Sequence, residues 1–450
     1  MKIPIQPPGF WEVLSGSLVS GDTQLQHRML NASLVDDQGR YLHWDKLRHL
    51  SPPVDMSLEQ WWASIRYARA QAARELPLSD KNGQKFSYCI PDAVTRDLHW
   101  LDRHAAGSIQ ADEAVTSPAT RDTYLIRSLA EEAINSSQLE GASTTSDVAR
   151  EMIRQQRDPR DKSECMIANN YHAMQFIRDI KGELLTPSII FELHRILTQN
   201  TLDRPNMAGR FRKNSEDIHV VDNVSQAVLH TPPNADDLAT RMQQLCDFAN
   251  DNDAEPFVHP VIKAIVLHFM LAYDHPFYDG NGRTARALFY WYMAKQGYWL
   301  VEFISISGVI KEAPAQYGRA YLYTETDGGD LTYFLLHQLE VIHKAIDALH
   351  VYLDKKIQGL NAAEALLKQN QKLRGKLNFR QLSLLRHALK HPRFAYVVDE
   401  HRNSHGVSYD VARKDLLQMS DQLKLLEKTK VGKRYKFLVP DDLEMRITQG

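Results

Sequence analysis

The sequence has 450 residues, 43% of them hydrophobic, and a net charge of −2 at pH 7. This length predicts about two to three domains. The longest nearly apolar run, Ala264–Tyr273, is too short for a membrane helix, and the N-terminus lacks the pattern of a signal peptide. Three scattered cysteines form no disulfide framework and no zinc-binding pair. We therefore expect a cytoplasmic protein without membrane contact or structural zinc.

Residues 1–115 are predicted to form an N-terminal helical extension. The stretch 58–75 carries Trp61, Ile65 and Ala68 at helical spacing, which indicates a helix that packs on something larger. No catalytic pattern occurs in this part. The next stretch, 121–143, has leucines at helical spacing and reads as one amphipathic helix that ends at an acid-glycine pair.

A short β-hairpin interrupts the helical pattern further along the chain. Helical periodicity runs from 161 to 197, and then two short apolar pieces, 218–221 and 227–229, predict a hairpin or flap before a Pro-Pro pair. Helices resume afterwards. The segment 262–270 has a broad apolar stripe, and Pro276 predicts that its helix ends near Asp274.

The loop that follows, HPFYDGNGRTAR at 275–286, has the residues of an anion site. Its two glycines permit a tight turn that exposes backbone N–H groups at the start of a new helix. Arg283 and Arg286 are placed to bind phosphate oxygens. Asp279 beside a phosphate would be repulsive without a divalent cation, which predicts Mg²⁺. His275 is the nearby group suited to act as a general base.

Other interpretations of the same residues are less specific. Each feature alone is more often a helix end, a surface turn or a solvated pair of arginines. Gly280-x-Gly282-x-x-Ala285 fits the dinucleotide fingerprint, but a helix rather than a strand precedes it. His259, His268 and His275 do not have the spacing of known zinc ligands.

The C-terminal part is basic. From Gln371 to Lys436 there are 16 Lys and Arg against 6 Asp and Glu. A helical connector is predicted over 351–376, and residues 377–440 resemble a winged helix-turn-helix, with a β-wing in LEKTKVGKRYKFLVP. Such a module binds DNA, or it serves protein contacts and homodimer formation. The residues expected to contact DNA are Ser408, Tyr409, Arg413, Lys414, Lys433 and Arg434.

The loop 275–286 resembles the signature of the Fic family, HPFxDGNGRxxR, at every fixed position. The resemblance implies a mainly α fold, in which an all-helical Fic core over 116–350 carries a β-hairpin flap. It also implies transfer of AMP from ATP to a protein hydroxyl. His275 would be the base and Asp279 the Mg²⁺ ligand, and the flap residues Ile218, His219, Val220 and Val221 would pair with the target. ATP would be bound by Phe277, Gly280, Asn281, Gly282, Arg283, Arg286 and Tyr317.

A second stretch, SSQLEG at 136–141, resembles the inhibitory pattern of the family, [ST]xxxE[GN], through Ser136, Glu140 and Gly141. The resemblance implies that an inhibitory helix near 121–142 brings Glu140 to Arg286, where its carboxylate takes the place of the γ-phosphate. We therefore predict an autoinhibited protein adenylyltransferase. The alternatives are a de-AMPylase that uses Glu140, a DNA-binding regulator whose Fic domain senses nucleotide, and transfer of another nucleotide such as UMP.

Overall fold

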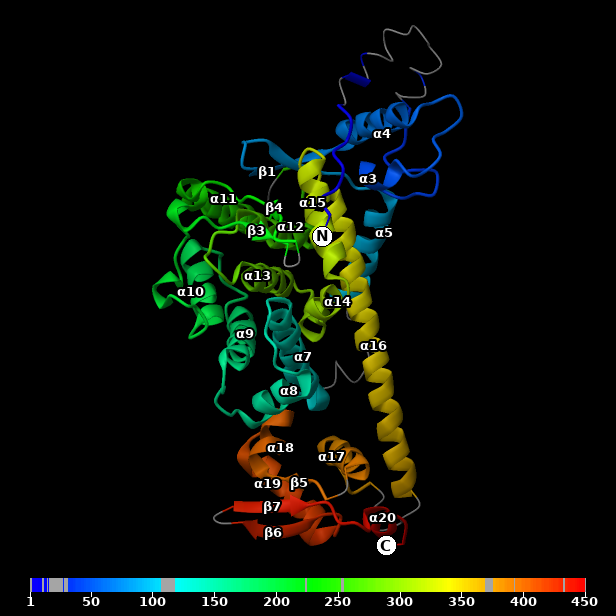
Figure 1. Cartoon of the computed structure of the whole chain (residues 1–450). Helices are drawn as coiled ribbons and strands as arrows, with labels where there is room; N and C mark the ends of the chain where they lie inside the picture. The colour runs from blue at the N-terminus through cyan, green and yellow to red at the C-terminus, as the bar shows by residue number, and fades with distance from the viewer. Residues whose placement is uncertain are drawn as a thin grey trace.

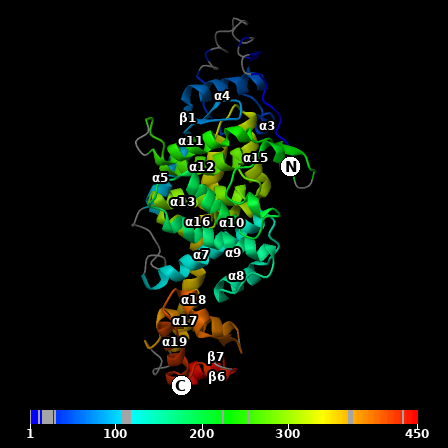
Figure 2. The same ribbon diagram turned by 90° about the vertical axis from the view of Figure 1, so that its left-hand side faces the viewer.

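The computed structural model describes residues 2–9, 12–13, 15, 27, 31–106, 118–222, 225–251, 255–368, 375–391, 393–431 and 434–449. The molecule is elongated (Figure 1). A central helical body lies between an N-terminal part at one end and a small C-terminal unit at the other, and the perpendicular view shows the same order (Figure 2). None of the helices in the described ranges is long and apolar enough to cross a membrane.

The N-terminal part contains strands that the sequence analysis did not foresee. Its elements are α3 (Trp44–Leu47), α4 (Leu58–Ala72), β1 (Arg74–Ser79), β2 (Lys85–Tyr88) and α5 (Asp92–Leu101). The strands pair antiparallel across a turn in which the Asp80 carboxylate accepts the N–H groups of Asn82 and Gln84. Side chains of β1, β2 and α5 are buried in the same core as the central helices. This region therefore contains both helices and strands, and it packs against the central body.

Arg69 of α4 connects the start of the chain to the body. Its guanidinium is 2% exposed and lies 3.5 Å from the centre of the Tyr41 ring. It donates to the carbonyls of Leu34 and Leu42 at 2.9 and 3.0 Å, and to the Tyr333 hydroxyl at 2.7 Å. A buried guanidinium is tolerated because its N–H groups have partners.

The central body is helical because its segments carry apolar stripes wide enough to bury. Its helices are α7 (Pro118–Leu139), α8 (Ser146–Gln155), α9 (Lys162–Asp179), α10 (Pro187–Thr198), α11 (Leu238–Asn250), α12 (Pro260–Asp274), α13 (Asn281–Lys295), α14 (Ile306–Glu312), α15 (Pro314–Thr326) and α16 (Thr332–Lys368). Nearly every side chain of α12 is buried, and α13 packs along it. A helix that is apolar on all sides belongs at the centre of a core.

Helix α16 continues through residue 350, where the boundary between the Fic core and the connector is expected. It runs without interruption over 37 residues, from the central body past that position to Lys368. In Figure 1 it extends along the body and leads to the C-terminal unit. The connector predicted from 351 therefore begins as a continuation of a core helix.

The flap is smaller than predicted. Strand β3 is Val220–Val221 and pairs antiparallel with β4, Val228–His230. Ile218 and His219, which were assigned to the flap, precede the strand. His230 anchors β4, because its ring nitrogens lie 2.8 Å from a Glu325 carboxylate oxygen and 2.7 Å from the Tyr273 carbonyl.

The C-terminal unit has its own hydrophobic core. It contains α17 (Phe379–Lys390), β5 (Ala395–Tyr396), α18 (Val398–His405), α19 (Tyr409–Leu417), β6 (Glu427–Val431), β7 (Arg434–Leu438) and α20 (Leu443–Gln449), with sheet order β5-β7-β6. Asp415 joins α19 to the other helices by accepting from Asn378 at 2.8 Å, Arg380 at 2.7 Å and His401 at 3.2 Å.

We predict that Arg69→Met destabilises the protein by about 3 kcal/mol, because the replacement leaves two buried carbonyls without donors. The measurement is urea unfolding followed by fluorescence. Lys85→Met, on an exposed side chain of β2, is the control and should stay within about 0.5 kcal/mol of wild type. Equal stability of the two variants would contradict this role for Arg69.

Candidate functional site

The loop between α12 and α13 is shaped by two residues with positive φ. His275 closes α12 at φ 45°, and its N–H donates to the Leu271 carbonyl at 3.1 Å. Gly280 opens α13 at φ 86° and has no side chain that caps the helix. A Cβ at Gly280 would also lie 2.9 Å from Thr198. The first N–H groups of α13 therefore face outward from the loop without an intrahelical acceptor.

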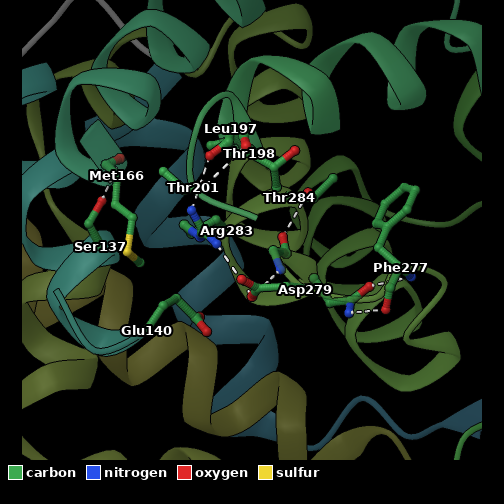
Figure 3. A network of polar contacts seen from close by, with 12 residues as sticks. Ser137, Glu140, Met166, Leu197, Thr198, Thr201, Phe277, Asp279, Arg283 and Thr284 are labelled. Carbon is green, nitrogen blue, oxygen red and sulfur yellow. Dashed lines mark hydrogen bonds and ion pairs between the residues drawn. The ribbon is translucent and has the colours of Figure 1, made fainter. Parts of the chain in front are cut away.

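Asn281 holds the loop closed from inside. Its side-chain amide accepts the Phe277 N–H and donates to the Phe277 carbonyl, both at 2.9 Å. The Gly280 carbonyl accepts the Thr284 N–H at 3.0 Å and the Thr284 hydroxyl at 2.9 Å. These bonds, some of which are drawn in Figure 3, fix the backbone of the turn with groups that belong to the turn and its helix.

His194 of α10 supports the loop from below, and sequence reasoning missed it. Its ring stacks on Phe277 with centroids 3.8 Å apart. Because Nδ1 accepts the Gly209 N–H at 2.9 Å, Nε2 carries the proton and donates to the Asp279 carbonyl at 2.8 Å. Burial lowers the pKa of His194 to about 4, so the ring is neutral at pH 7. A lone histidine within an amphipathic helix carries no signal of this contact.

Arg212 was also missed, although it lies in the segment that leads to the flap. It is 6% exposed, and its Nε donates to the His275 carbonyl at 2.8 Å. Its backbone N–H donates to the Pro276 carbonyl at 2.8 Å. Burial lowers the pKa of Arg212, and the nearby Asp274 carboxylate opposes this effect. Arg212 thus holds the backbone at the point where α12 ends.

The imidazole of His275 is half-buried at the mouth of the loop. Burial lowers its pKa to about 4, and the negative charge of Glu140 acts in the opposite direction. The ring is therefore neutral at pH 7 and has a nitrogen able to accept a proton. Nδ1 lies 3.4 Å from the Ala272 carbonyl, which orients the ring relative to its own helix.

Arg283 and Asp279 form a pair at the start of α13 (Figure 3). The Arg283 side chain is 1% exposed, donates to the Leu197 carbonyl at 3.0 Å and lies 3.4 Å from Asp279 Oδ1. The Arg283 guanidinium therefore binds the backbone of a neighbouring segment, whereas the Asp279 side chain is 47% exposed. Asp279 also accepts the Gly280 N–H at 2.6 Å. Its carboxylate faces solvent beside the N-terminal end of α13.

Arg286 is bound by residues at the C-terminal end of α7. Its Nε donates to the Ser136 hydroxyl at 2.9 Å, and Nη2 donates to the Ser136 carbonyl at 3.1 Å and to Glu140 Oε1 at 2.8 Å. Burial opposes ionisation of Glu140, but the charges of Arg286 and Arg283 outweigh it and lower its pKa. The structure thus brings together the residues of two motifs that are 150 positions apart.

Gly282 leaves room for this ion pair. A Cβ at this position would lie 2.2 Å from Glu140 Oε1 and 3.0 Å from Arg286 Nη1. The first contact is far inside van der Waals distance, so Glu140 occupies the space directly above the backbone of Gly282. The carboxylate therefore covers the N-terminal turn of α13.

The end of α7 places Glu140. The helix ends at Leu139, the Glu140 N–H donates to the Ser137 carbonyl at 3.1 Å, and Gly141 follows with φ 94°. The Ser137 hydroxyl donates to the Met166 carbonyl at 3.1 Å, which attaches this end of α7 to α9 (Figure 3). Glu140 is thus presented from a fixed helix end.

Glu132 attaches the middle of α7, and sequence reasoning missed it as well. The carboxylate is 1% exposed and accepts hydrogen bonds from the Tyr290 hydroxyl at 2.9 Å, the Ser305 hydroxyl at 2.8 Å and the Ser307 N–H at 3.1 Å. Burial raises its pKa. In the sequence it belongs to a Glu-Glu pair, which is the usual pattern of a solvated helix face.

The remaining predicted residues lie apart from the loop or at its edge. The Tyr317 hydroxyl lies 2.8 Å from His268 Nε2 and 3.1 Å from the Tyr321 hydroxyl, so this ring is packed into an aromatic cluster. On α19, Tyr409, Arg413 and Lys414 are exposed, and the Ser408 hydroxyl caps the helix through the Val411 N–H. Lys433 and the side chain of Arg434 lie outside the described residues.

We predict that His194→Phe keeps the stacking on Phe277 but costs about 1–3 kcal/mol of unfolding free energy at pH 7, because two polar groups lose their partner. The folded-state pKa of about 4 lies below the ordinary value of 6.5. Protonation therefore favours the unfolded wild type as the pH falls from 6.5 to 4, by up to roughly 3 kcal/mol. The difference between wild type and variant should shrink over that range.

Urea unfolding at pH 7, 6, 5 and 4 measures this difference. His99→Phe replaces an exposed histidine and is the control, for which no such convergence with wild type is expected. A difference between wild type and His194→Phe that stays constant with pH would contradict the neutral, doubly bonded ring.

Comparison with known proteins identifies the region that contains the loop. Residues 184–293 match the model of the Fic/DOC family. The chain is 28% identical over 235 residues to a protein adenylyltransferase Fic of Nematostella vectensis. The matched segment covers 49% of this chain and 50% of that protein. It is 35% identical over 128 residues to the protein of the same name from Drosophila willistoni, covering 28% and 23% of the two chains. The chain thus spans half or less of the length of these relatives.

A crystal structure of a Fic family protein from Desulfovibrio desulfuricans G20 superposes with a TM-score of 0.49 at 17% identity, covering 79% of this chain and 98% of that one. The match to the family model includes the whole loop 275–286 and the helices on both sides of it. Residues 184–293 therefore form a Fic/DOC family domain.

Proposed function

We propose that this chain is an autoinhibited protein adenylyltransferase, which transfers AMP from ATP to a Ser, Thr or Tyr hydroxyl of a target protein or of itself. The observation that carries the proposal is the contact of Glu140 with Arg286 above the N-terminal turn of α13, beside a neutral His275. Homology to proteins named protein adenylyltransferase supports the reaction type.

In the proposed reaction the hydroxyl oxygen of the target attacks the α-phosphorus of ATP. A bond forms between these atoms while the bond from the α-phosphorus to the oxygen that bridges to the β-phosphate breaks, and pyrophosphate leaves. His275 takes the hydroxyl proton, for which its neutral ring is suited. A pKa of about 4 makes it a weak base, so deprotonation has to accompany attack on phosphorus.

The start of α13 binds the phosphates in this proposal. The N–H groups of Asn281, Gly282 and Arg283 are the first three of the helix and meet anions with the positive end of its dipole. Arg286 binds the γ-phosphate once Glu140 has left. Arg283 mainly holds the protein backbone in place, because it is buried and already donates to the Leu197 carbonyl. In this proposal Tyr317 would lie near the adenine.

Asp279 fits the role of the Mg²⁺ ligand. Its carboxylate is half-exposed beside the phosphate-binding turn, and Mg²⁺ in phosphoryl-transfer sites is commonly held by one or two carboxylates and by the substrate phosphates. When bound there, the ion supplies charge neutralisation for the phosphates of ATP. His194 fixes the backbone of Asp279, so the ligand is preorganised.

Glu140 inhibits by occupying Arg286 and the space above Gly282. Both are needed by the γ-phosphate, and an ATP molecule that cannot reach them binds weakly or with its α-phosphate out of line. One carboxylate oxygen of Glu140 accepts from Arg286, and the side chain is 28% exposed, so water can reach it. This access favours removal of AMP from a modified target as a second reaction, with Glu140 positioning the water.

The flap is proposed to bind the target. Strands β3 and β4 form a two-stranded sheet whose outer edges are unpaired within it, and Val221 and Val228 are 39% and 48% exposed. An extended target segment can add to such an edge through main-chain hydrogen bonds. This arrangement would bring the target hydroxyl to His275 without requiring a particular side-chain sequence.

The test is incubation of the purified chain with Mg²⁺ and α-labelled ATP, with cell lysate as a source of targets. Wild type, Glu140→Gly, and Glu140→Gly combined with His275→Ala are compared. We expect label on protein with Glu140→Gly, at least about tenfold above wild type, because the variant frees a charged contact for the γ-phosphate. The double variant should return to background. Absence of label in all three would rule out the transferase.

We propose in addition that the C-terminal unit binds DNA through α19. The side chains of Tyr409, Arg413 and Lys414 lie exposed on this helix, on a unit with a paired β6–β7 hairpin. This pattern fits a recognition helix with a wing. The same face could instead bind an acidic protein or a second copy of the chain.

Replacement of Arg413 and Lys414 by Ala should weaken DNA binding about tenfold or more at low salt, and flatten its dependence on salt concentration by about two phosphate contacts. Fluorescence anisotropy with a labelled random-sequence duplex measures both effects. The exposed Lys85, on the N-terminal part, provides the control variant Lys85→Ala. If the variant binds the duplex as tightly as wild type does, or if neither protein binds it, α19 has no DNA-binding role.

A further inference from the structure

A large cleft lies between the central body and the C-terminal unit, away from the loop 275–286. Its volume is about 1370 Å³, and its walls come from α7, α8, α9, α16, α17 and α18. In Figure 1, α17 and α18 lie directly below α7 and α8. Small-molecule sites generally measure a few hundred to about 1,000 Å³, so the cleft can admit a ligand of nucleotide size. None of its lining residues belongs to the site described above.

The lining of the cleft has more positive than negative groups. Seven arginines and lysines line it against four acidic residues, and five histidines add to the basic side. Three of the four acids are already engaged by arginines. Arg150 binds Glu131, with Nε–Oε1 at 2.6 Å, and Arg154 contacts Glu151 at 2.6 Å and Glu400 at 3.3 Å. The excess positive charge of the lining therefore comes from basic residues other than Arg150 and Arg154.

The surplus is carried by Arg127 of α7 and by Arg386 and Lys390 of α17. Among the residues that the structure describes, no ion pair neutralises any of these three. Arg127 lies over the ring of Tyr352, with its central carbon 4.0 Å from the centroid. They converge on the cleft from two helices that belong to different parts of the molecule.

Arg127, Tyr352 and Arg386 line the same cleft, and Arg127 lies directly over the Tyr352 ring. Burial raises the pKa of its phenol to about 12, and the positive charges of Arg127 and Arg386 both oppose that increase. Positive groups that line one cleft without a counter-charge repel each other. An anion between them removes that repulsion and gains hydrogen bonds from both.

We propose that this cleft binds a phosphate-bearing ligand, with its phosphate held between Arg127 and Arg386 and a further contact from Lys390. Guanidinium groups match phosphate oxygens in pairs, and a doubly charged phosphate balances the excess better than a single carboxylate. Free polyphosphates and nucleotides share this chemistry. Tyr171, Tyr352 and Phe394, all partly accessible in the lining, provide flat surfaces on which a nucleotide base can stack.

The position of the site connects it to the proposed inhibition. Arg127 lies on α7, whose end presents Glu140, and the Arg154 carbonyl of α8 accepts from Asn403 of α18 at 3.2 Å. A phosphate bound by Arg127 and Arg386 adds a connection between α7, the proposed inhibitory helix, and the C-terminal unit. Binding at the cleft itself does not depend on the proposed transferase activity.

The test is isothermal titration calorimetry with the full chain, Glu140 retained, and inorganic pyrophosphate and ATP as separate probes. We expect saturable binding of pyrophosphate that weakens about tenfold or more in both Arg127→Gln and Arg386→Gln, since each removes a charged hydrogen bond to phosphate. Arg96→Gln, at an exposed arginine of α5 outside the cleft, should bind as wild type does.

Two arms distinguish the source of the phosphate. Equal loss of pyrophosphate and ATP binding in the variants identifies a site for phosphate groups alone, whereas ATP binding that exceeds pyrophosphate binding and suffers the same loss identifies a nucleotide site. The proposal is overturned if pyrophosphate does not bind saturably, or if neither replacement weakens its binding. Because calorimetry requires no AMP transfer, these outcomes are independent of the labelling experiment.

Discussion

The site is organised by the need of a buried guanidinium for an anion. Arg286 is 2% exposed and lies in the middle of the body, where an unpaired charge would cost several kcal/mol. Ser136 satisfies part of its hydrogen bonding but none of its charge. Glu140 supplies the negative charge, and a phosphate is the other group that could do so. In the proposed function, Glu140 and the γ-phosphate of ATP are therefore alternative partners that satisfy the same electrostatic requirement.

The groups that would compete in this proposal are rigidly placed. Glu132 and Ser137 attach α7 to its neighbours at two levels, so Glu140 approaches from a fixed direction. On the other side, His194, Arg212 and Asn281 hold the loop by its backbone. Rigid placement means that little conformational entropy is lost when either anion binds. Which of the two anions binds Arg286 then depends only on the charge and the fit of each anion.

The parts of the site that could be predicted are those with local causes. The end of α12 follows from Pro276, and the turn into α13 follows from the two glycines of the loop, because backbone sterics act between neighbours. The contact of Glu140 with Arg286 followed only from the resemblance to the Fic family, since its partners are 146 positions apart.

The supporting residues could not be predicted for the opposite reason. His194, Arg212 and Glu132 act through backbone carbonyls, N–H groups and hydroxyls of distant segments, and such contacts leave no periodicity or spacing in the sequence. The β1–β2 hairpin was missed because alternation over such short strands is weak. The continuity of α16 across residue 350 could not be predicted either, because a helical core segment and a helical connector have similar sequence patterns.

The close approach of Glu140 to the backbone of Gly282 makes two distant positions depend on each other in evolution. A Cβ at position 282 would collide with the Glu140 carboxylate, so a chain that keeps this contact needs glycine there. If a substrate phosphate takes the place of Glu140, as proposed, a lineage that lost Glu140 would still need the glycine, whereas a lineage that replaced Gly282 would lose the reason to keep Glu140. Loss of the two residues is therefore expected to be directional, with position 282 constraining position 140 and not the reverse.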